Sequence, residues 1–509
     1  MLFLVLSLTP LVPSSFILGF VDRSTTWNNL NCLPALGTLY AYKNAAKLAK
    51  ESHGLDIDED LRAGKISIGL YHTAGKGTRL APLPGAENNN KPGVKLPATV
   101  QIGGQAAPIT ILEAVIKQTG CYAKSRMGRL SVFWGDQVFI PTVPVAYTVT
   151  HHADILCSLG PMLSEGEWKA KGMDKYGLIA QAAGGAAQVE KVDHATAVQL
   201  LASLGEIKSV GASLGSFSIS SHMLFILLNE FSVELETKKG KLDSDPHLWM
   251  PMTLERAPYL QLMGQKGIAA DVAGAHFDRI QVMMTRFTAD AATKAANMGV
   301  FGPVDVGQGV FWWDYGQLPL YQKNTIMMTD SSDESDLMRL FFGIEGGGRV
   351  TSSAIDSKVT VDAASCVSSS TVGCSGRIVR SVLSNVRCNS IDAEGCVLIN
   401  VTADRIVAKP GSIVYNIVQS GNLDLEEGAV FAGVFAEDGS QLGVTSSIST
   451  DGGKVWETKL AANSSSFEGI YNSNTEVCPT ALEGVIASAH ATMWASIEAD
   501  ESSAKRSRT

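Results

Sequence analysis

A glycine-rich loop follows the first clear strand pattern and has the composition of a phosphate-binding loop. Its four residues are Gly75, Lys76, Gly77 and Thr78. Residues 66–70, just before it, alternate as a β-strand does, and glycines leave backbone amides free to cradle a phosphate at the C-terminal edge of a sheet. Arg79 follows, and its planar guanidinium can bridge phosphate oxygens. An isolated Gly-Lys-Gly is more often a surface turn, so the surrounding residues must decide its role.

The loop differs from two familiar nucleotide-binding motifs. A Walker A motif requires Ser or Thr directly after its Gly-Lys, whereas Gly77 follows Lys76. A dinucleotide fingerprint requires a third glycine where this chain has Leu80. The sequence therefore excludes a P-loop and a dinucleotide site at this position.

Two aspartates each stand at the end of an apolar, strand-like run. Asp136 follows residues 130–134, and Asp314 follows residues 310–313. Carboxylate oxygens are ligands that Mg²⁺ prefers, yet a single aspartate in such a place is more often a turn or cap residue. Only the two together, in the context of the family resemblance given below, make a metal site.

The elements around these residues alternate in type. Residues 28–61 and 109–120 have helical patterns, the second with a glycine stop, and 130–134 is a short strand pattern. Strand, loop, helix and strand in this order predict an α/β fold, with a mostly parallel mixed sheet and helices on both faces. This pattern continues, less clearly, to about residue 345.

Beyond residues 346–348, Gly-Gly-Gly, the chain changes to short β-branched runs. Asn385, Asn400 and Asn416 recur at spacings of 15 and 16, each beside an apolar run. This near-period predicts a C-terminal β-helix-like domain, with an irregular β-sandwich as the alternative. In a β-helix the cysteines would be small core or corner residues; they are Cys366, Cys374, Cys388 and Cys396.

These patterns divide the chain into four parts. They are an N-terminal extension with a helix (1–62), a catalytic α/β domain (63–345), the β-helix-like domain (350–450), and a C-terminal helix with a disordered tail (451–509). Residues 1–20 lack charge and are either a targeting segment or a buried extension. We expect a cytoplasmic protein, or one of an organelle or the secretory pathway if that segment is a signal.

Composition excludes several classes of protein. Lys and Arg total 41 against 50 Asp and Glu, so the net charge of −9 does not favour nucleic acid as a partner. No stretch approaches about twenty uninterrupted apolar residues, so we expect no membrane span. The eight cysteines form no C-x-x-C pair, which disfavours structural zinc and a disulfide framework.

Taken together, the motifs resemble those of the sugar-1-phosphate nucleotidylyltransferases, also called NDP-sugar pyrophosphorylases. The resemblance spans about residues 66–330. Many members of that family have a Rossmann-like nucleotidyltransferase domain of the GT-A type followed by a left-handed β-helix. The motifs that carry the resemblance are Gly75 to Leu83, Lys91-Pro92, Gly135-Asp136-Gln137, Tyr176-Gly177, Val189-Glu190-Lys191, and Trp313 to Gly316 with Tyr321 and Asn324.

The resemblance implies Mg²⁺-dependent nucleotidyl transfer from an NTP to a hexose-1-phosphate, as in nucleotide-sugar biosynthesis. Arg79 and Lys91 would be catalytic, with residues 75–78 binding the nucleotide. Asp136 and Asp314 would hold Mg²⁺. The loop between Arg79 and Lys91 is longer than is usual in the family, and Lys95 competes with Lys91 for the lysine role.

For the sugar phosphate, the resemblance implies three further residues. Gly177 would let the sugar approach the backbone, Glu190 would accept its hydroxyls and Lys191 would meet its phosphate. A non-catalytic, nucleotide-sugar-binding regulatory subunit is the alternative, because the region 104–135 that would read the base is short. We expect a homo-oligomer that associates through residues from about 350 onward, and NTP binding by a chain that ends near Glu345.

Overall fold

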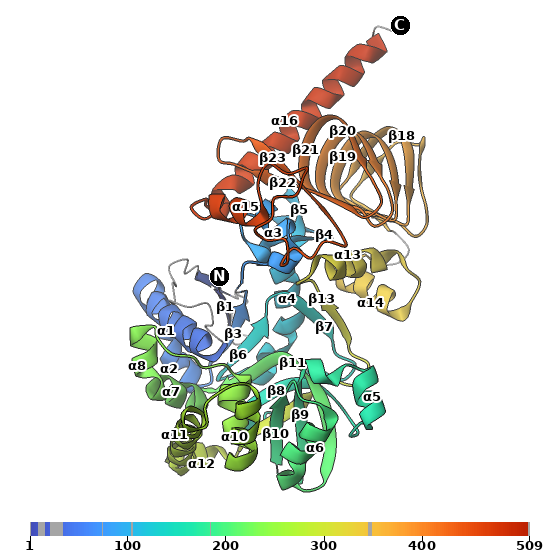
Figure 1. The fold of residues 1–509 in the computed structure, drawn as a ribbon. Helices are drawn as coiled ribbons and strands as arrows, with labels where there is room; N and C mark the ends of the chain where they lie inside the picture. Colours follow the sequence, from blue (N-terminus) through green and yellow to red (C-terminus); the bar gives the residue numbers. More distant parts are fainter. Residues whose placement is uncertain are drawn as a thin grey trace. The chain divides into compact units, whose positions relative to one another are not determined.

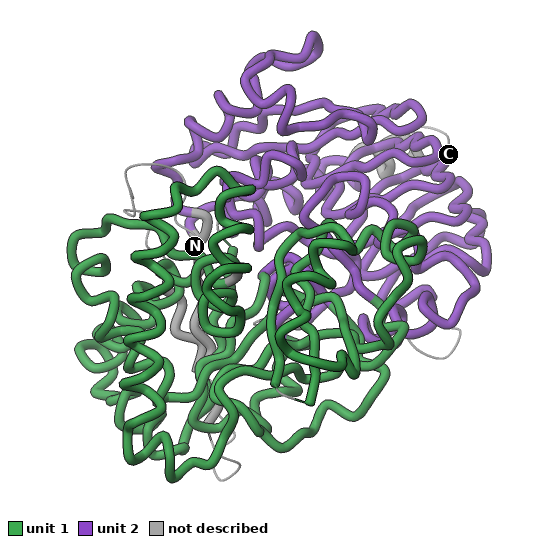
Figure 2. Tube along the Cα trace, turned by 60° about the horizontal axis from the view of Figure 1, so that its bottom comes forward, with its two compact units in different colours: residues 1–74, 117–134, 139–311 green, residues 75–116, 135–138, 312–509 purple. Residues whose placement is uncertain are grey.

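A computed structural model describes residues 2–8, 16–20, 34–73, 75–102, 105–183, 185–344 and 349–506. The chain forms two compact units, which Figure 2 colours separately. Unit 1 comprises residues 1–74, 117–134 and 139–311, and unit 2 comprises residues 75–116, 135–138 and 312–509. Both units are discontinuous in sequence, whereas the four predicted parts are consecutive. Residues 345–348, at the expected boundary, lie outside the described residues.

Unit 1 is built on a mixed sheet with helices packed against it (Figure 1). Its strand order is β10-β9-β11-β6-β3-β1-β2, with β8 paired to β11 and β12 to β8. The strands are β1 (Leu2–Leu8), β2 (Phe16–Phe20), β3 (Ile66–His72), β6 (Arg129–Trp134), β8 (His151–Gly160), β9 (Gly177–Ala182), β10 (Gly185–Glu190), β11 (Ile207–Ser220) and β12 (Gly299–Asp305). The helices are α1 (Pro34–His53), α2 (Ile57–Arg62), α5 (Glu165–Ala170), α6 (His194–Leu201), α7 (Ser221–Glu230), α8 (Ser232–Thr237), α9 (Met250–Thr253), α10 (Arg256–Gln265), α11 (Ala270–Ala289) and α12 (Ala291–Ala296).

Strand β3 is buried along almost its whole length, so its alternation is one of large apolar residues with the small Ser67 and Gly69 rather than of buried with exposed positions. It pairs in parallel with β6, and β8 pairs in parallel with β12; the other described pairs of this sheet are antiparallel. Strand β1 runs antiparallel beside β3. Residues 2–8 therefore extend the sheet, and a targeting role for residues 1–20 stays a prediction.

Unit 2 contains the glycine-rich loop, a hairpin and a β-solenoid of about five turns. Ahead of the solenoid come η1 (Thr78–Leu80), α3 (Leu83–Ala86), η2 (Lys91–Gly93), the hairpin β4 (Lys95–Ile102) and β5 (Gln105–Thr110), α13 (Leu318–Ile326) and α14 (Asp333–Phe341). The solenoid strands are β14 (Val350–Thr351), β15 (Ala354–Ile355), β16 (Val359–Val361), β17 (Cys366–Ser368), β18 (Thr371–Val379), β19 (Val382–Glu394), β20 (Val397–Ala408), β21 (Ile413–Leu425), β22 (Ala429–Phe435) and β23 (Gln441–Ser447), followed by α15 (Phe467–Ser473) and α16 (Pro479–Arg506). Three elements cross the division between the units: α4 (Ile111–Thr119), β7 (Gln137–Ile140) and β13 (Phe311–Asp314).

The asparagine repeat in the sequence marks successive coils of the solenoid. Asn385 Nδ2 donates to Asn400 Oδ1 at 2.6 Å, and Asn400 Nδ2 donates to Asn416 Oδ1 at 2.6 Å. All three have left-handed backbones, with φ of 54° to 56°, which asparagine tolerates better than most residues. The strands beside them pair in parallel, so equivalent apolar residues stack in the core. The predicted β-helix is confirmed, and the sandwich alternative is wrong.

The interior of the solenoid holds most of its cysteines, and a helix packs against its coils. Cys366, Cys388 and Cys396 are buried as predicted, but Cys374 is exposed because it lies on an outward position of β18. Helix α16 packs on β19, β20 and β21, and its Leu482 is fully buried. The helix continues to Arg506, through residues predicted to be a disordered tail.

The predicted fold class is confirmed: a mixed sheet with helices precedes a β-solenoid. The strand pairs described in this sheet are mostly antiparallel, however, rather than mostly parallel as predicted. Among the described residues, no helix combines the length and apolarity that crossing a membrane requires. A cytoplasmic location stays a prediction.

Candidate functional site

The glycine-rich loop in unit 2 turns sharply at two glycines. Gly75 has φ of +106° and Gly77 has φ of +68°, conformations that residues with a Cβ rarely adopt. A Cβ on Gly77 would lie 3.0 Å from Pro84 Cγ and 3.4 Å from Lys91 Cβ. The loop therefore packs directly against the residue predicted to be its catalytic lysine. Arg79, on the η1 turn, is exposed and makes no ion pair within the described residues.

The two predicted metal ligands meet in unit 2 at one glycine. A Cβ on Gly316 would lie 2.7 Å from Asp136 Oδ2 and 3.1 Å from Asp314 Oδ1. The Gly316 amide donates to Asp314 Oδ1 at 2.7 Å, and the Tyr315 amide donates to the Asp136 carbonyl at 2.9 Å. Gly316 thus leaves the room in which the two carboxylates converge.

Lys91 and Lys95, the two candidates for the lysine role, have different partners. Lys91 Nζ donates to Asp136 Oδ2 at 2.5 Å, and both side chains are largely buried. Lys95 Nζ donates to Glu87 Oε1 at 2.5 Å instead. Of the two lysines, Lys91 is therefore the one that contacts the acidic pair.

Burial raises the pKa of the Asp314 carboxyl above its usual range. The Gly316 amide, together with the positive charges of Arg79 and Lys91, opposes this rise, whereas the charge of Asp136 adds to it. The charge of Asp136 therefore disfavours the charged form of Asp314, and the nearby cations offset only part of the rise in the Asp314 pKa. A divalent cation between them would relieve that repulsion.

The two carboxylates suit Mg²⁺ better than a metal ion whose ligands all come from protein side chains. Within the described ranges, no group of three or more His, Cys, Asp and Glu side chains is placed to hold a metal ion. Mg²⁺ is commonly bound through one or two carboxylates, with water and substrate phosphates completing its octahedron. Asp136 and Asp314 supply that number of hard oxygen ligands.

The predicted sugar residues lie together in unit 1. Gly177, at the start of β9, is paired in register with Glu190, at the end of β10. A Cβ on Gly177 would lie 2.4 Å from Glu190 Oε2, an atom that is buried and has no hydrogen-bond partner among the described residues. Lys191 is mostly exposed, has φ of +54°, and its Nζ lies 3.2 Å from Glu190 Oε1. An unpartnered buried carboxylate oxygen beside an exposed cation is suited to a polar ligand.

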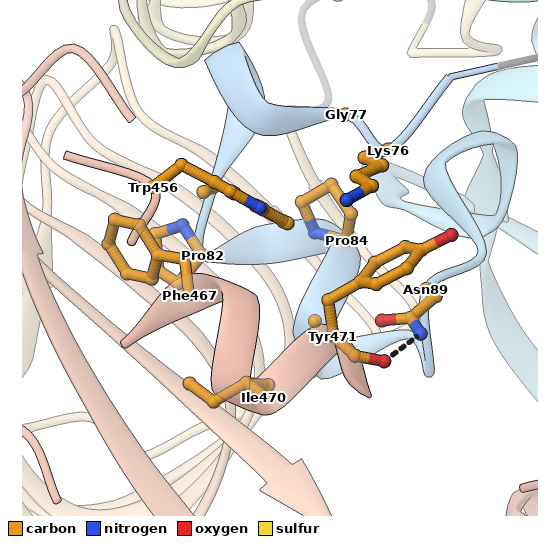
Figure 3. Close-up of a pocket in the computed structure, with 11 residues that line it drawn as sticks. Lys76, Gly77, Pro82, Pro84, Asn89, Trp456, Phe467, Ile470 and Tyr471 are labelled. Carbon is orange, nitrogen blue, oxygen red and sulfur yellow. Dashed lines mark hydrogen bonds between the residues drawn. The ribbon is translucent and has the colours of Figure 1, made fainter. Parts of the chain in front are cut away.

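Sequence reasoning missed a C-terminal segment that lies against the glycine-rich loop within unit 2. Lys76 Nζ lies 5.8 Å and 5.2 Å from the ring centres of Trp456 and Tyr471, and 3.8 Å from Glu468 Oε1. Figure 3 shows these two rings on either side of the small pocket into which Lys76 points. A Cβ on Gly452 would lie 2.3 Å from the Thr78 carbonyl oxygen.

Residues 456–471 thus contact the side chain of Lys76, which was predicted to bind nucleotide. The side chain of Arg79, by contrast, is exposed. A local sequence pattern gives no sign of this contact, because the two segments are separated by most of the chain. The aromatic residues in an otherwise Ser-, Asn- and Gly-rich stretch were the one available signal.

Comparisons with known proteins do not assign this chain to a family. No protein-family model matches the chain, and no curated protein sequence matches it. A solved structure that it resembles is described as the crystal structure of mannose-1-phosphate geranyltransferase from Thermus thermophilus. The sequences are 13% identical, the match covers 73% of this chain and 92% of the other, and the TM-score is 0.25. The residues and contacts described above therefore carry the proposal that follows.

Proposed function

We propose that the protein is a sugar-1-phosphate nucleotidylyltransferase, which transfers a nucleotidyl group from an NTP to a hexose-1-phosphate. The observation that carries this proposal is the convergence of Asp136 and Asp314 at Gly316, with Lys91 paired to Asp136 beside the loop that contains Gly77. These residues come from three separate segments of the sequence, and each belongs to a motif that resembles the family. Their convergence gives a cation and two hard oxygen ligands next to a phosphate-binding loop.

The reaction needs positioning and charge neutralisation rather than a protein nucleophile. A phosphate oxygen of the sugar-1-phosphate forms a bond to the α-phosphorus of the NTP. The bond from that phosphorus to the oxygen bridging to the β-phosphate breaks, and pyrophosphate leaves with the electron pair. Arg79 and Lys91 would bind the oxygens of the triphosphate, and the loop amides would hold its phosphates.

Asp136 and Asp314 would hold Mg²⁺ in this proposal. When bound, Mg²⁺ would neutralise negative charge on the phosphate oxygens. Glu190 would accept hydrogen bonds from sugar hydroxyls, and Lys191 would pair with the phosphate of the sugar. Both are available for these roles, because Glu190 Oε2 has no described partner and Lys191 is mostly exposed.

A pyrophosphate-release assay tests the proposal directly. All four NTPs are combined with glucose-, mannose-, galactose-, fucose- and N-acetylglucosamine-1-phosphate, each with Mg²⁺ and with EDTA. We expect release with at least one pair and its loss in EDTA. Nucleotide-sugar binding without turnover for any pair would instead support a non-catalytic regulatory subunit.

A further inference from the structure

One buried tyrosine hydroxyl in unit 2 makes hydrogen bonds to both ends of the segment 87–95, which contains Lys91. Tyr415 lies on β21 of the solenoid and is fully buried. Its hydroxyl donates to Glu87 Oε1 at 2.5 Å and accepts the backbone N–H of Lys95 at 2.7 Å. Glu87 precedes Lys91 in the chain and Lys95 follows it, so the two hydrogen bonds close the segment 87–95 into a loop.

Other contacts tighten the same segment. Lys95 Nζ also donates to Glu87 Oε1, and the hydroxyl of Tyr321 donates to the Lys95 carbonyl at 2.6 Å. The backbone N–H and the backbone C=O of Lys95 are therefore both held by buried tyrosine hydroxyls. Glu87 and Lys95 are themselves largely buried, so these charge-assisted hydrogen bonds are shielded from water.

The solenoid meets the segment at a second, neighbouring residue. Asn416 is the last member of the asparagine ladder, and its Nδ2 lies 3.3 Å from the Ala86 carbonyl oxygen and 3.2 Å from the Gly433 carbonyl oxygen. Two neighbouring solenoid residues, Asn416 and Tyr415, thus bond the adjacent residues Ala86 and Glu87. The long loop between Arg79 and Lys91 is therefore ordered by contacts with the solenoid.

We propose that Tyr415 is a positioning residue, which holds the segment 87–95 closed and thereby keeps Lys91 beside Asp136. Burial and the Glu87 charge raise the pKa of Tyr415 well above its usual value, so its hydroxyl keeps the proton that it donates. The effect on turnover rests on the proposed function, but the effect on the placement of Lys91 does not.

Lysine labelling tests the placement of Lys91 without any assay of activity. The protein is treated briefly with acetic anhydride, and acetylation of each lysine is followed by mass spectrometry. In the wild-type protein Lys91 should react slowly, because its side chain is 14% exposed and paired with Asp136. Tyr415→Phe should raise its rate several-fold, while the rate of Lys169, whose side chain is 74% exposed, should not change.

A matched control separates the loss of this hydroxyl from the loss of any buried one. Tyr42 is also buried, and its hydroxyl donates to Asp58 Oδ1 at 2.6 Å in unit 1. Tyr42→Phe removes an equivalent tyrosine–carboxylate hydrogen bond and should leave Lys91 labelling unchanged. Equal labelling of Lys91 in folded Tyr415→Phe and wild-type protein would overturn the proposal.

Kinetics give a second readout where the enzyme is active. Tyr415→Phe should lower kcat about tenfold and leave the KM for the sugar phosphate unchanged, because a small misplacement of a charge-neutralising group weakens the transition state. In a Lys91→Ala background the same change should cost nothing further, since Tyr415 acts through Lys91. Additive losses in this double-mutant cycle would contradict the proposal.

The proposal stays testable if Tyr415→Phe does not fold, and also if the proposed function is wrong. If Tyr415→Phe does not fold, Glu87→Gln keeps the size of the side chain while weakening its bonds to Tyr415 and Lys95, and it should raise Lys91 labelling in the same way. If the wild-type protein turns over no substrate pair, the proposed function fails while the labelling still decides the role of Tyr415.

Discussion

Lys91 Nζ lies 2.5 Å from Asp136 Oδ2, so the cation predicted to meet the triphosphate is paired with an acid predicted to hold the metal. The Lys91 ammonium has three N–H donors, so it could donate to a phosphate oxygen of a bound nucleotide while it stays paired with Asp136. Both side chains of this ion pair are largely buried.

We first predict that both aspartates are required for turnover. Asp136→Asn and Asp314→Asn should each lower kcat by roughly a hundredfold or more, because each removes an electrostatic contact to charge at the α-phosphate. Steady-state pyrophosphate release measures the effect. Asp438→Asn removes a carboxylate that only caps an exposed turn at Ser440, and it should leave kcat unchanged. Wild-type kcat in either active-site variant would rule out the proposed metal site.

The second prediction concerns the glycine between the two carboxylates. Gly316→Ala places a methyl group 2.7 Å from Asp136 Oδ2 and should displace that side chain. We expect weaker Mg²⁺ binding and at least a tenfold loss of kcat. Gly166→Ala, in α5, meets no atom within 4 Å and serves as the control. An unchanged Mg²⁺ dependence in Gly316→Ala would contradict a metal site at this point.

The third prediction is a pH effect on stability with opposite signs at two aspartates. The folded state raises the pKa of Asp314, so the folded protein holds this proton more tightly and the carboxyl contributes stability only at low pH. That contribution is lost as pH rises through the raised pKa. Asp314→Asn should therefore raise Tm at pH 7 to 8 in the absence of metal, and the gain should shrink toward pH 4.

Asp193 provides the control of opposite sign. Hydrogen bonds from Thr196 lower the pKa of its carboxyl at the start of α6, so its contribution is present at neutral pH and lost on acidification. Asp193→Asn should lower Tm slightly at pH 7 to 8. Differential scanning calorimetry from pH 4 to 8 measures both variants, and a lower neutral Tm for Asp314→Asn would show that its charge is favourable in the folded protein.

The parts of this fold that were predictable from sequence are those with a local period. Alternation over residues 66–70 marks β3 although both faces of that strand are buried, because small residues stand between the large ones. The spacing of Asn385, Asn400 and Asn416 marks the coils because each asparagine bonds the next. The break between the end of α1 at His53 and the start of α2 at Ile57, and the continuation of α16 to Arg506, were missed, because helix ends depend on local packing and capping. The predicted start of the first helix at residue 28 lies outside the described residues.

Contacts between distant segments had no comparable signal. Asn89 Nδ2 donates to the Tyr471 carbonyl, and Asn474 Nδ2 donates to the Gly85 carbonyl, so the loop after Arg79 is held by residues near the C-terminus. The loop between Arg79 and Lys91 is longer than usual, and its additional residues make these contacts. These contacts argue against the expectation that a chain ending near Glu345 still binds NTP, because such a chain lacks the partners that order this loop.

The fourth prediction is that the protein forms a homo-oligomer. The exposed positions of α16 within residues 491–499 and the lateral faces of the solenoid offer surface for a second copy, and solenoids commonly cover such faces by packing against a cap or another subunit. Size-exclusion chromatography with light scattering should give at least the mass of a dimer for the full chain. A mass of 54.0 kDa at all concentrations would refute the predicted homo-oligomer.

The last prediction assigns Arg79 and Lys191 to different substrates. Arg79 follows the phosphate-binding loop, so Arg79→Ala should mainly lower kcat and raise the KM for NTP. Lys191 lies beside Glu190 in the other unit, so Lys191→Ala should mainly raise the KM for the sugar phosphate, about tenfold, by removing ground-state binding.

Lys169→Ala is the matched control, because Lys169 is an exposed lysine of unit 1 that also pairs with a glutamate, Glu165. It should change neither KM. Initial rates with each substrate varied in turn separate the two assignments. If Lys191→Ala behaves as Lys169→Ala does, then Glu190 and Lys191 form a surface ion pair, and the buried Glu190 oxygen beside Gly177 must have a structural role instead.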